Sequence, residues 1–204
     1  MTISKKIQQA INKAAELHIN QVRKGYSDNP IPYITHPFSV AYIISKYTSD
    51  EATIIAALLH DVLEDVKKEV YSHEQMIRDF GVEVYEIVKG VSEDKDATIT
   101  KEEETRTWIT RKEKYIQHLY KDSDHSLMVC CGDKIHNITS LCEIYEKSSN
   151  KEIALDSFNA PIDKKVNILW HYEEVYRVMS DKFHNPIVNE LGEAVKNLKR
   201  VFST

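Results

Sequence analysis

The residues best suited to chemistry in this sequence are acids and imidazoles that occur where burial is expected. His60 and Asp61 follow the apolar run Ile54–Leu59 and precede Val62 and Leu63. An imidazole and a carboxylate placed in core-like surroundings cost free energy unless they are paired. A divalent cation is the simplest partner, because it lets several crowded carboxylates stay ionised. The pattern therefore predicts a metal site.

Two further residues complete a ligand set. His36 follows a proline-bearing loop and begins a helix, and Asp133 lies inside the apolar run Leu127–Ile138, so burial would normally forbid both without a partner. We expect His36, His60, Asp61 and Asp133 to hold one ion, although a His-Asp pair on its own often arises by chance. Two imidazoles and two carboxylates favour Mn²⁺, Fe²⁺ or Zn²⁺. Four protein ligands on an octahedral ion leave two positions for a water and a phosphate oxygen.

Two more acids follow one helical turn later. Glu64 and Asp65 are spaced to lie above His60 and Asp61 on one continuous helix. From there they could orient or deprotonate the attacking water without touching the metal. The alternative is an exposed helix end carrying solvated acids.

The elements that position these residues are predicted to be helices. Only five Gly and five Pro occur in 204 residues, and apolar residues recur at three- and four-residue spacing, so we expect an all-α, single-domain fold spanning residues 1–204. The expected helices cover residues 3–22, 37–47, 48–65, 72–81, 82–91, two stretches between 105 and 141, 161–179 and 186–202. Thr48 with Glu51, and Ser72 with Gln75, read as capping boxes.

One polar segment interrupts this pattern. Residues 92–104 alternate acids and lysines with few apolar side chains, which is typical of a solvated loop. The segment could serve as a lid or as a linker.

Bulk properties narrow the class of protein. A net charge of −5 argues against a protein that coats nucleic acid or an anionic membrane. No apolar run approaches membrane-spanning length and the amino terminus lacks a signal-like stretch, so we expect a soluble cytoplasmic protein. Cys130, Cys131 and Cys142 are predicted to be reduced and buried. The sequence leaves open whether the chain forms a homo-oligomer.

Four segments together carry a family resemblance. They are Arg23-Lys24, residues 32–37 (PYITHP), residues 56–65 (AALLHDVLED) and residues 132–137 (GDKIHN). In order and spacing they resemble the hydrolase domain of the RelA/SpoT alarmone enzymes, over about residues 14–141. The length of the chain is similar to that of the stand-alone small alarmone hydrolases, including the metazoan type.

This resemblance implies an HD-type helical bundle and a specific reaction. The reaction is Mn²⁺-dependent hydrolysis of the 3′-pyrophosphate of ppGpp or pppGpp, which gives GDP or GTP and pyrophosphate. The resemblance assigns the metal to the four ligands named above and the attacking water to Glu64 and Asp65. It further implies that the substrate, a guanine nucleotide, is bound by Arg23, Lys24, Asn137, Arg111 and Lys112. Guanidinium and ammonium groups suit that task because they neutralise pyrophosphate charge, although each could also be an ordinary solvated side chain.

The sequence also departs from the family in one motif. The family usually has Lys-Leu-Ala-Asp at the last ligand, where this chain has Cys130-Cys131-Gly132-Asp133. The metal ligand survives this change, while substrate preference is open to change. Two alternatives therefore remain: an HD phosphohydrolase acting on a nucleoside monophosphate or on the 2′-phosphate of NADPH, and a non-catalytic module that binds nucleotide or a partner protein.

Overall fold

The regular structure of this protein is helical, as the sequence predicts. The computed structural model describes residues 3–25, 30–93, 100–156 and 158–203, and over these ranges an isolated bridge between Val22 and Pro32 is the only β pairing. The helices are α1 (Lys5–Leu17), α2 (Thr35–Ile44), α3 (Glu51–Leu59), α4 (Val62–Asp65), α5 (His73–Phe80), α6 (Val82–Val91), α7 (Lys101–Leu119), α8 (Asp124–Lys147), α9 (Lys151–Asp156), α10 (Lys164–Lys182) and α11 (Ile187–Phe202). None of these helices has both the length and the apolar character that crossing a membrane requires.

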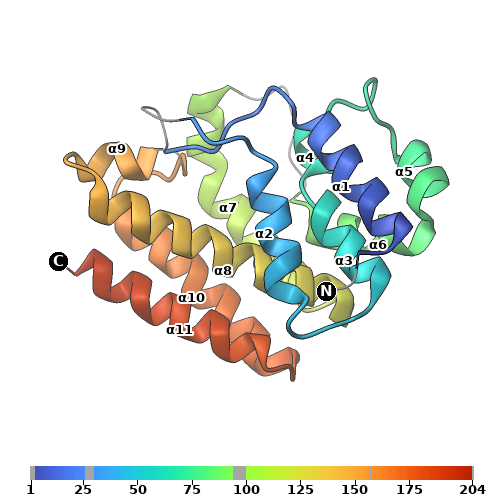
Figure 1. The fold of residues 1–204 in the computed structure, drawn as a ribbon. Coiled ribbons are helices and arrows are strands. Elements are labelled where there is room, and N and C mark those ends of the chain that lie inside the picture. The colour runs from blue at the N-terminus through green and yellow to red at the C-terminus, as the bar shows by residue number, and fades with distance from the viewer. Residues whose placement is uncertain (1–2, 26–29, 94–99, 157, 204) are drawn as a thin grey trace.

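Helices α3 and α8 form the centre of the fold. Every residue of α3 from Thr53 to Leu59 is buried, so this helix is covered on all sides. Helix α8 contacts α2, α3, α6, α10 and α11. In Figure 1, α11 runs along one side of α8 while α2 and α3 lie against its N-terminal half. The central helices therefore carry any polar residue on their inner faces into the core.

Helix α2 can approach α8 closely because residue 132 is a glycine. A Cβ atom built on Gly132 would lie 2.5 Å from Cγ2 of Ile44 and 3.2 Å from Cγ1 of Val40, both side chains of α2. A Cβ contact of 2.5 Å essentially never occurs in real structures, so the side chain of Ile44 or the helix would have to shift. This approach sets the separation of His36 on α2 from Asp133 on α8.

The start of α3 differs from the prediction. Asp50, and not Thr48, is the N-cap: its carboxylate accepts the backbone N–H of Thr53 at 2.8 Å. Thr48 lies outside the helix, where its hydroxyl accepts the N–H of Asp50 at 3.1 Å. A cap must reach the N–H groups of the first turn, and Asp50 is the residue placed to do so.

The end of α3 also differs, because the predicted continuous helix through Asp65 is wrong. Helix α3 ends at Leu59, and α4 begins anew at Val62. The His60 side chain donates from Nδ1 to the carbonyl of Ala57 at 2.8 Å. In a continuous helix that carbonyl would accept the N–H of Asp61, so the side chain competes with the helical ladder at the break.

Two other predictions are confirmed: the capping box formed by Ser72 and Gln75, and the burial of the three free cysteines. Helix α1 ends at Leu17, short of the predicted residue 22, because the following segment pairs with residues 31–33. The prediction of a loop over 92–104 is wrong at its end, since Thr100 caps α7 and residues 101–104 are helical. Residues 94–99 lie outside the described residues. Helix α9 was not predicted.

Candidate active site

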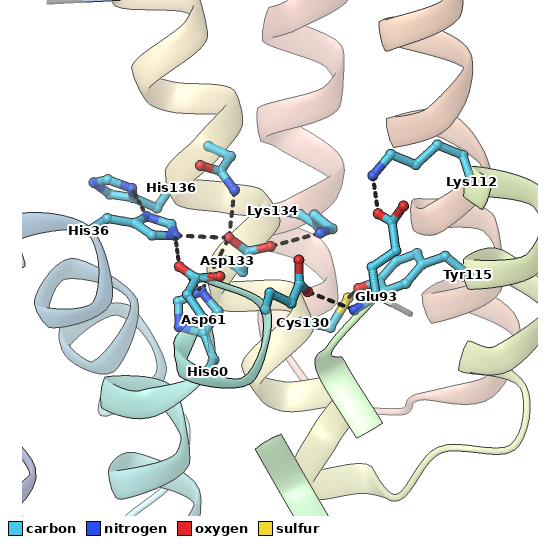
Figure 2. A network of polar contacts seen from close by, with 12 residues as sticks. His36, His60, Asp61, Glu93, Lys112, Tyr115, Cys130, Asp133, Lys134 and His136 are labelled. Carbon is cyan, nitrogen blue, oxygen red and sulfur yellow. Dashed lines mark hydrogen bonds and ion pairs between the residues drawn. The ribbon is translucent and has the colours of Figure 1, made fainter. Parts of the chain in front are cut away.

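Four side chains from three parts of the fold converge at the centre of the bundle. Nε2 of His36 lies 3.4 Å from Oδ2 of Asp61 and 3.2 Å from Oδ1 of Asp133. Nε2 of His60 lies 3.1 Å from the same Asp61 oxygen and 3.7 Å from the same Asp133 oxygen. Figure 2 shows the four side chains pointing toward one another. Neighbouring ligands about 2.1 Å from one octahedral ion lie about 3 Å apart, so these spacings suit a first-row divalent metal.

His60 supplies the most direct test of whether a metal fits. Its Nδ1 must donate to the Ala57 carbonyl, so the neutral ring carries a lone pair on Nε2. That Nε2 is buried, faces the two carboxylates and has no hydrogen-bond partner among the described residues. A lone pair aimed at two carboxylates is satisfied only by a cation or a proton. The donor set therefore fits a divalent metal.

The electrostatics of the cluster agree with this requirement. Burial alone would lower the pKa of His60, but the carboxylates of Asp61 and Asp133 raise that pKa well above its usual value. Burial opposes ionisation of Asp133, yet Lys134 and the two histidines hold its pKa well below the usual range. The carboxylates thus remain ionised, and together they favour a positive charge at the centre of the cluster.

Neighbouring side chains orient the four donors. Nδ1 of His36 lies 2.8 Å from Nδ1 of His136, and the Tyr33 hydroxyl donates to Asp61 at 2.6 Å. The Lys134 ammonium donates to Oδ2 of Asp133 at 2.7 Å, leaving Oδ1 toward the histidines. Such outer contacts fix the orientation of ligating groups.

Two adjoining cavities open onto this cluster. The smaller, about 150 Å³, is lined by His36, His60, Asp61 and Asp133. The larger, about 460 Å³, shares Asp61 with it and extends outward between α7, α8 and α10. Its size falls in the usual range for small-molecule sites. A ligand can therefore reach the cluster with one end while the rest of it lies in the larger cavity.

The predicted acids and basic residues all line these cavities. Their wall residues include Arg23, Lys24, Glu64, Asp65, Arg111, Lys112 and Asn137. The structure brings Arg23 and Asn137 together, with the guanidinium donating to the amide oxygen at 3.2 Å, and Asn137 in turn donates to Asp133 at 2.5 Å. Glu64 and Asp65 reach the cavities from the separate short helix α4.

Sequence reasoning gave no role to four residues that complete the site: Tyr33, Glu93, Lys134 and His136. Tyr33, Lys134 and His136 lie within three residues of a predicted metal ligand in the sequence. That proximity is the sequence signal that could have identified them. Glu93 lies in the predicted solvated loop, yet its side chain is only 8% exposed. No local pattern marks it.

The fold and the site define a class of protein. A bundle of helices that gathers two histidines and two aspartates around one point is the arrangement of an HD domain. The chain belongs to the HD domain family, whose model matches residues 10–160.

Two relatives match most of this chain, one over most of its own length and the other over a small part of its own length. A Danio rerio protein named guanosine-3′,5′-bis(diphosphate) 3′-pyrophosphohydrolase is 32% identical over 177 residues, covering 79% of this chain and 91% of the relative. A Borreliella burgdorferi protein of the same enzyme name is 29% identical over 169 residues, or 80% of this chain. This chain spans 23% of that relative, and about a fifth of other long bacterial relatives.

A solved structure supports the same grouping. It is described as a metazoan ortholog of SpoT that hydrolyses ppGpp, and it superposes with a TM-score of 0.72 at 25% identity. The match covers 96% of this chain and 97% of the other.

Proposed function

We propose that this chain hydrolyses the 3′-pyrophosphate of ppGpp and pppGpp, giving GDP or GTP and pyrophosphate, with Mn²⁺ as its metal. The observation that carries the proposal is that the two cavities share wall residues, among them Asp61, beside four converging donors. A phosphate at the cluster would leave the remainder of a nucleotide in the larger cavity. The enzyme names of the relatives supply the nucleotide.

The residues of the chain divide the work between binding and proton transfer. His36, His60, Asp61 and Asp133 would hold the ion, which supplies Lewis-acid chemistry when bound. Glu64 and Asp65, on α4 at the cavity wall, would orient the attacking water, and one of the two would accept its proton. Arg23 and Lys24 would neutralise phosphate charge, and Asn137 would orient the nucleoside while holding Asp133.

A substrate panel tests this proposal. The purified protein with Mn²⁺ is incubated with ppGpp, pppGpp, NADPH and nucleoside monophosphates, and the release of pyrophosphate is scored against that of phosphate. We expect pyrophosphate from the first two substrates alone. Release of phosphate from NADPH or from a monophosphate, with no pyrophosphate from ppGpp, would assign the site to another nucleotide. No turnover of any substrate would favour a binding module.

A further inference from the structure

Glu93 is an acid with a largely covered side chain, and it connects two walls of the site. It follows Ser92, the C-cap of α6, and its carboxylate faces α7. One carboxylate oxygen pairs with the Arg111 guanidinium, and the other accepts from the Lys112 ammonium at 2.5 Å. Figure 2 shows Glu93 and Lys112 meeting on the side of the site opposite His36. Two cations from α7 thus hold this carboxylate in one place.

The backbone of the same residue holds a proposed catalytic acid. The N–H of Glu93 donates to Oε1 of Glu64 at 2.6 Å. A short hydrogen bond to a carboxylate is among the stronger ones in proteins and fixes the direction of the acid. The orientation of Glu64 therefore depends on where the backbone of residue 93 lies.

Arg111 is committed to contacts inside the protein. Its Nε donates to the Thr107 hydroxyl at 3.3 Å, one terminal nitrogen donates to the Glu104 carbonyl at 3.2 Å, and the other meets Glu93. All three nitrogens thus have acceptors within the chain. This geometry differs from that of an arginine presented to a substrate phosphate, because substrate would have to replace an existing bond.

We infer that Glu93 is a positioning residue, through which Arg111 and Lys112 hold Glu64 toward the attacking water. The inference rests on the proposed function and assigns the two α7 cations to the protein's own acid. Without the carboxylate anchor, the N–H of residue 93 would no longer be held against Glu64. Displacing a catalytic group by about 1 Å can cost roughly a hundredfold in rate.

The first test is a double-mutant cycle between positions 93 and 64. Glu93→Ala should lower kcat about ten- to hundredfold while KM changes less than about threefold and metal content stays constant. In a Glu64→Gln background the same change should cost less than about threefold, because the group it positions has been altered. Glu103→Ala is the matched control: Glu103 lies on α7, is exposed and pairs with Arg106, so kcat should not change.

A second measurement does not depend on turnover. Exchange of the residue 93 amide hydrogen, followed by NMR, should be slow in the wild-type protein and faster in both Glu64→Ala and Arg111→Gln. Arg111→Gln also replaces Glu93→Ala in the cycle if the latter does not fold. Since exchange is measured without substrate, it separates failure of this inference from failure of the proposed function.

Two results would overturn the inference. If Glu93→Ala lowers KM and leaves kcat unchanged, its carboxylate competes with a substrate phosphate for Arg111 and Lys112. If Glu93→Ala costs the same factor with and without Glu64→Gln, it acts independently of Glu64.

Discussion

His36 and His136 face each other through their Nδ1 atoms, which lie 2.8 Å apart. One of the two nitrogens must donate. Burial, together with the nearby His36 and Arg23, lowers the pKa of His136 to about 4, so His136 is neutral at pH 7 and able to accept. With His36 as the donor, its Nε2 lone pair faces the cluster, as a metal ligand requires.

This contact predicts an effect of His136 on metal affinity. His136→Phe keeps a ring and removes the acceptor, so we expect affinity for Mn²⁺ to fall about 10- to 100-fold, as for other residues that orient a ligand. Calorimetric titration of the metal-free protein measures this. His136→Gln, which retains an acceptor, should recover part of the affinity; unchanged affinity in the Phe variant would show that His36 needs no such partner.

Asp61 is predicted to be required for both metal binding and activity. Its carboxylate oxygen lies near both histidine nitrogens, so Asp61→Ala removes a ligand and leaves the imidazoles without a carboxylate on that side. We expect metal content and turnover to be lost together, by elemental analysis and pyrophosphate release. Tyr33→Phe, which removes only the hydrogen bond to Asp61, is the milder comparison and should retain metal. Wild-type turnover in Asp61→Ala would refute the metal mechanism.

Glu64 is predicted to act on water and not as a ligand. Glu64→Gln keeps the size of the side chain and removes the base, so turnover should fall by about a hundredfold while metal content persists. Parallel measurement of bound metal and kcat decides the point. Loss of the metal would make Glu64 a ligand, and full activity would assign proton transfer to Asp65.

Asp50 is predicted to stabilise the helix that carries the site. Burial raises the pKa of Asp50, but the hydrogen bonds from Thr53 outweigh it and the net shift is downward from the usual 3.8. A lowered carboxyl pKa in the folded state stabilises the protein above that usual value, and the contribution is lost as pH falls below it. Asp50→Ala should therefore cost about 1 kcal/mol of unfolding free energy at pH 7 and less at pH 3.

Urea unfolding of the Asp50 variants at both pH values measures this difference. Asp50→Asn is the control, since it keeps a capping oxygen that does not titrate. A cost for Asp50→Ala that is equal at pH 7 and pH 3 would mean that ionisation of the cap contributes nothing.

Gly132 is predicted to control the spacing between α2 and α8. Gly132→Ala places a methyl group against Ile44 and Val40, so we expect a loss of about 1–3 kcal/mol in unfolding free energy. Metal affinity should fall as well, because His36 and Asp133 would move apart. Denaturant unfolding and metal titration on one preparation test both effects; a variant as stable as wild type would mean that α2 shifts at no cost.

Much of the fold could be predicted because its signals are local. Apolar spacing of three and four residues marked the helices, and the Ser72–Gln75 capping box marked the start of α5. The same reasoning failed at His60, where a side chain competes for the Ala57 carbonyl and divides one predicted helix into α3 and α4. A hydrophobic pattern does not reveal such competition, because it depends on which side chains are apolar and not on which group the Ala57 carbonyl accepts from.

The sequence by itself determined which residue types could serve the site: two imidazoles and two carboxylates in apolar surroundings, with acids and cations nearby. Only the tertiary structure decided their partners. The Arg23 guanidinium contacts the Asn137 side chain, 114 positions away in the sequence. The backbone N–H of Glu93 contacts the carboxylate of Glu64, 29 positions away. Periodicity and caps depend on neighbours within about four residues, whereas these contacts depend on how helix faces pack, and that packing brought an acid from a predicted loop into the site.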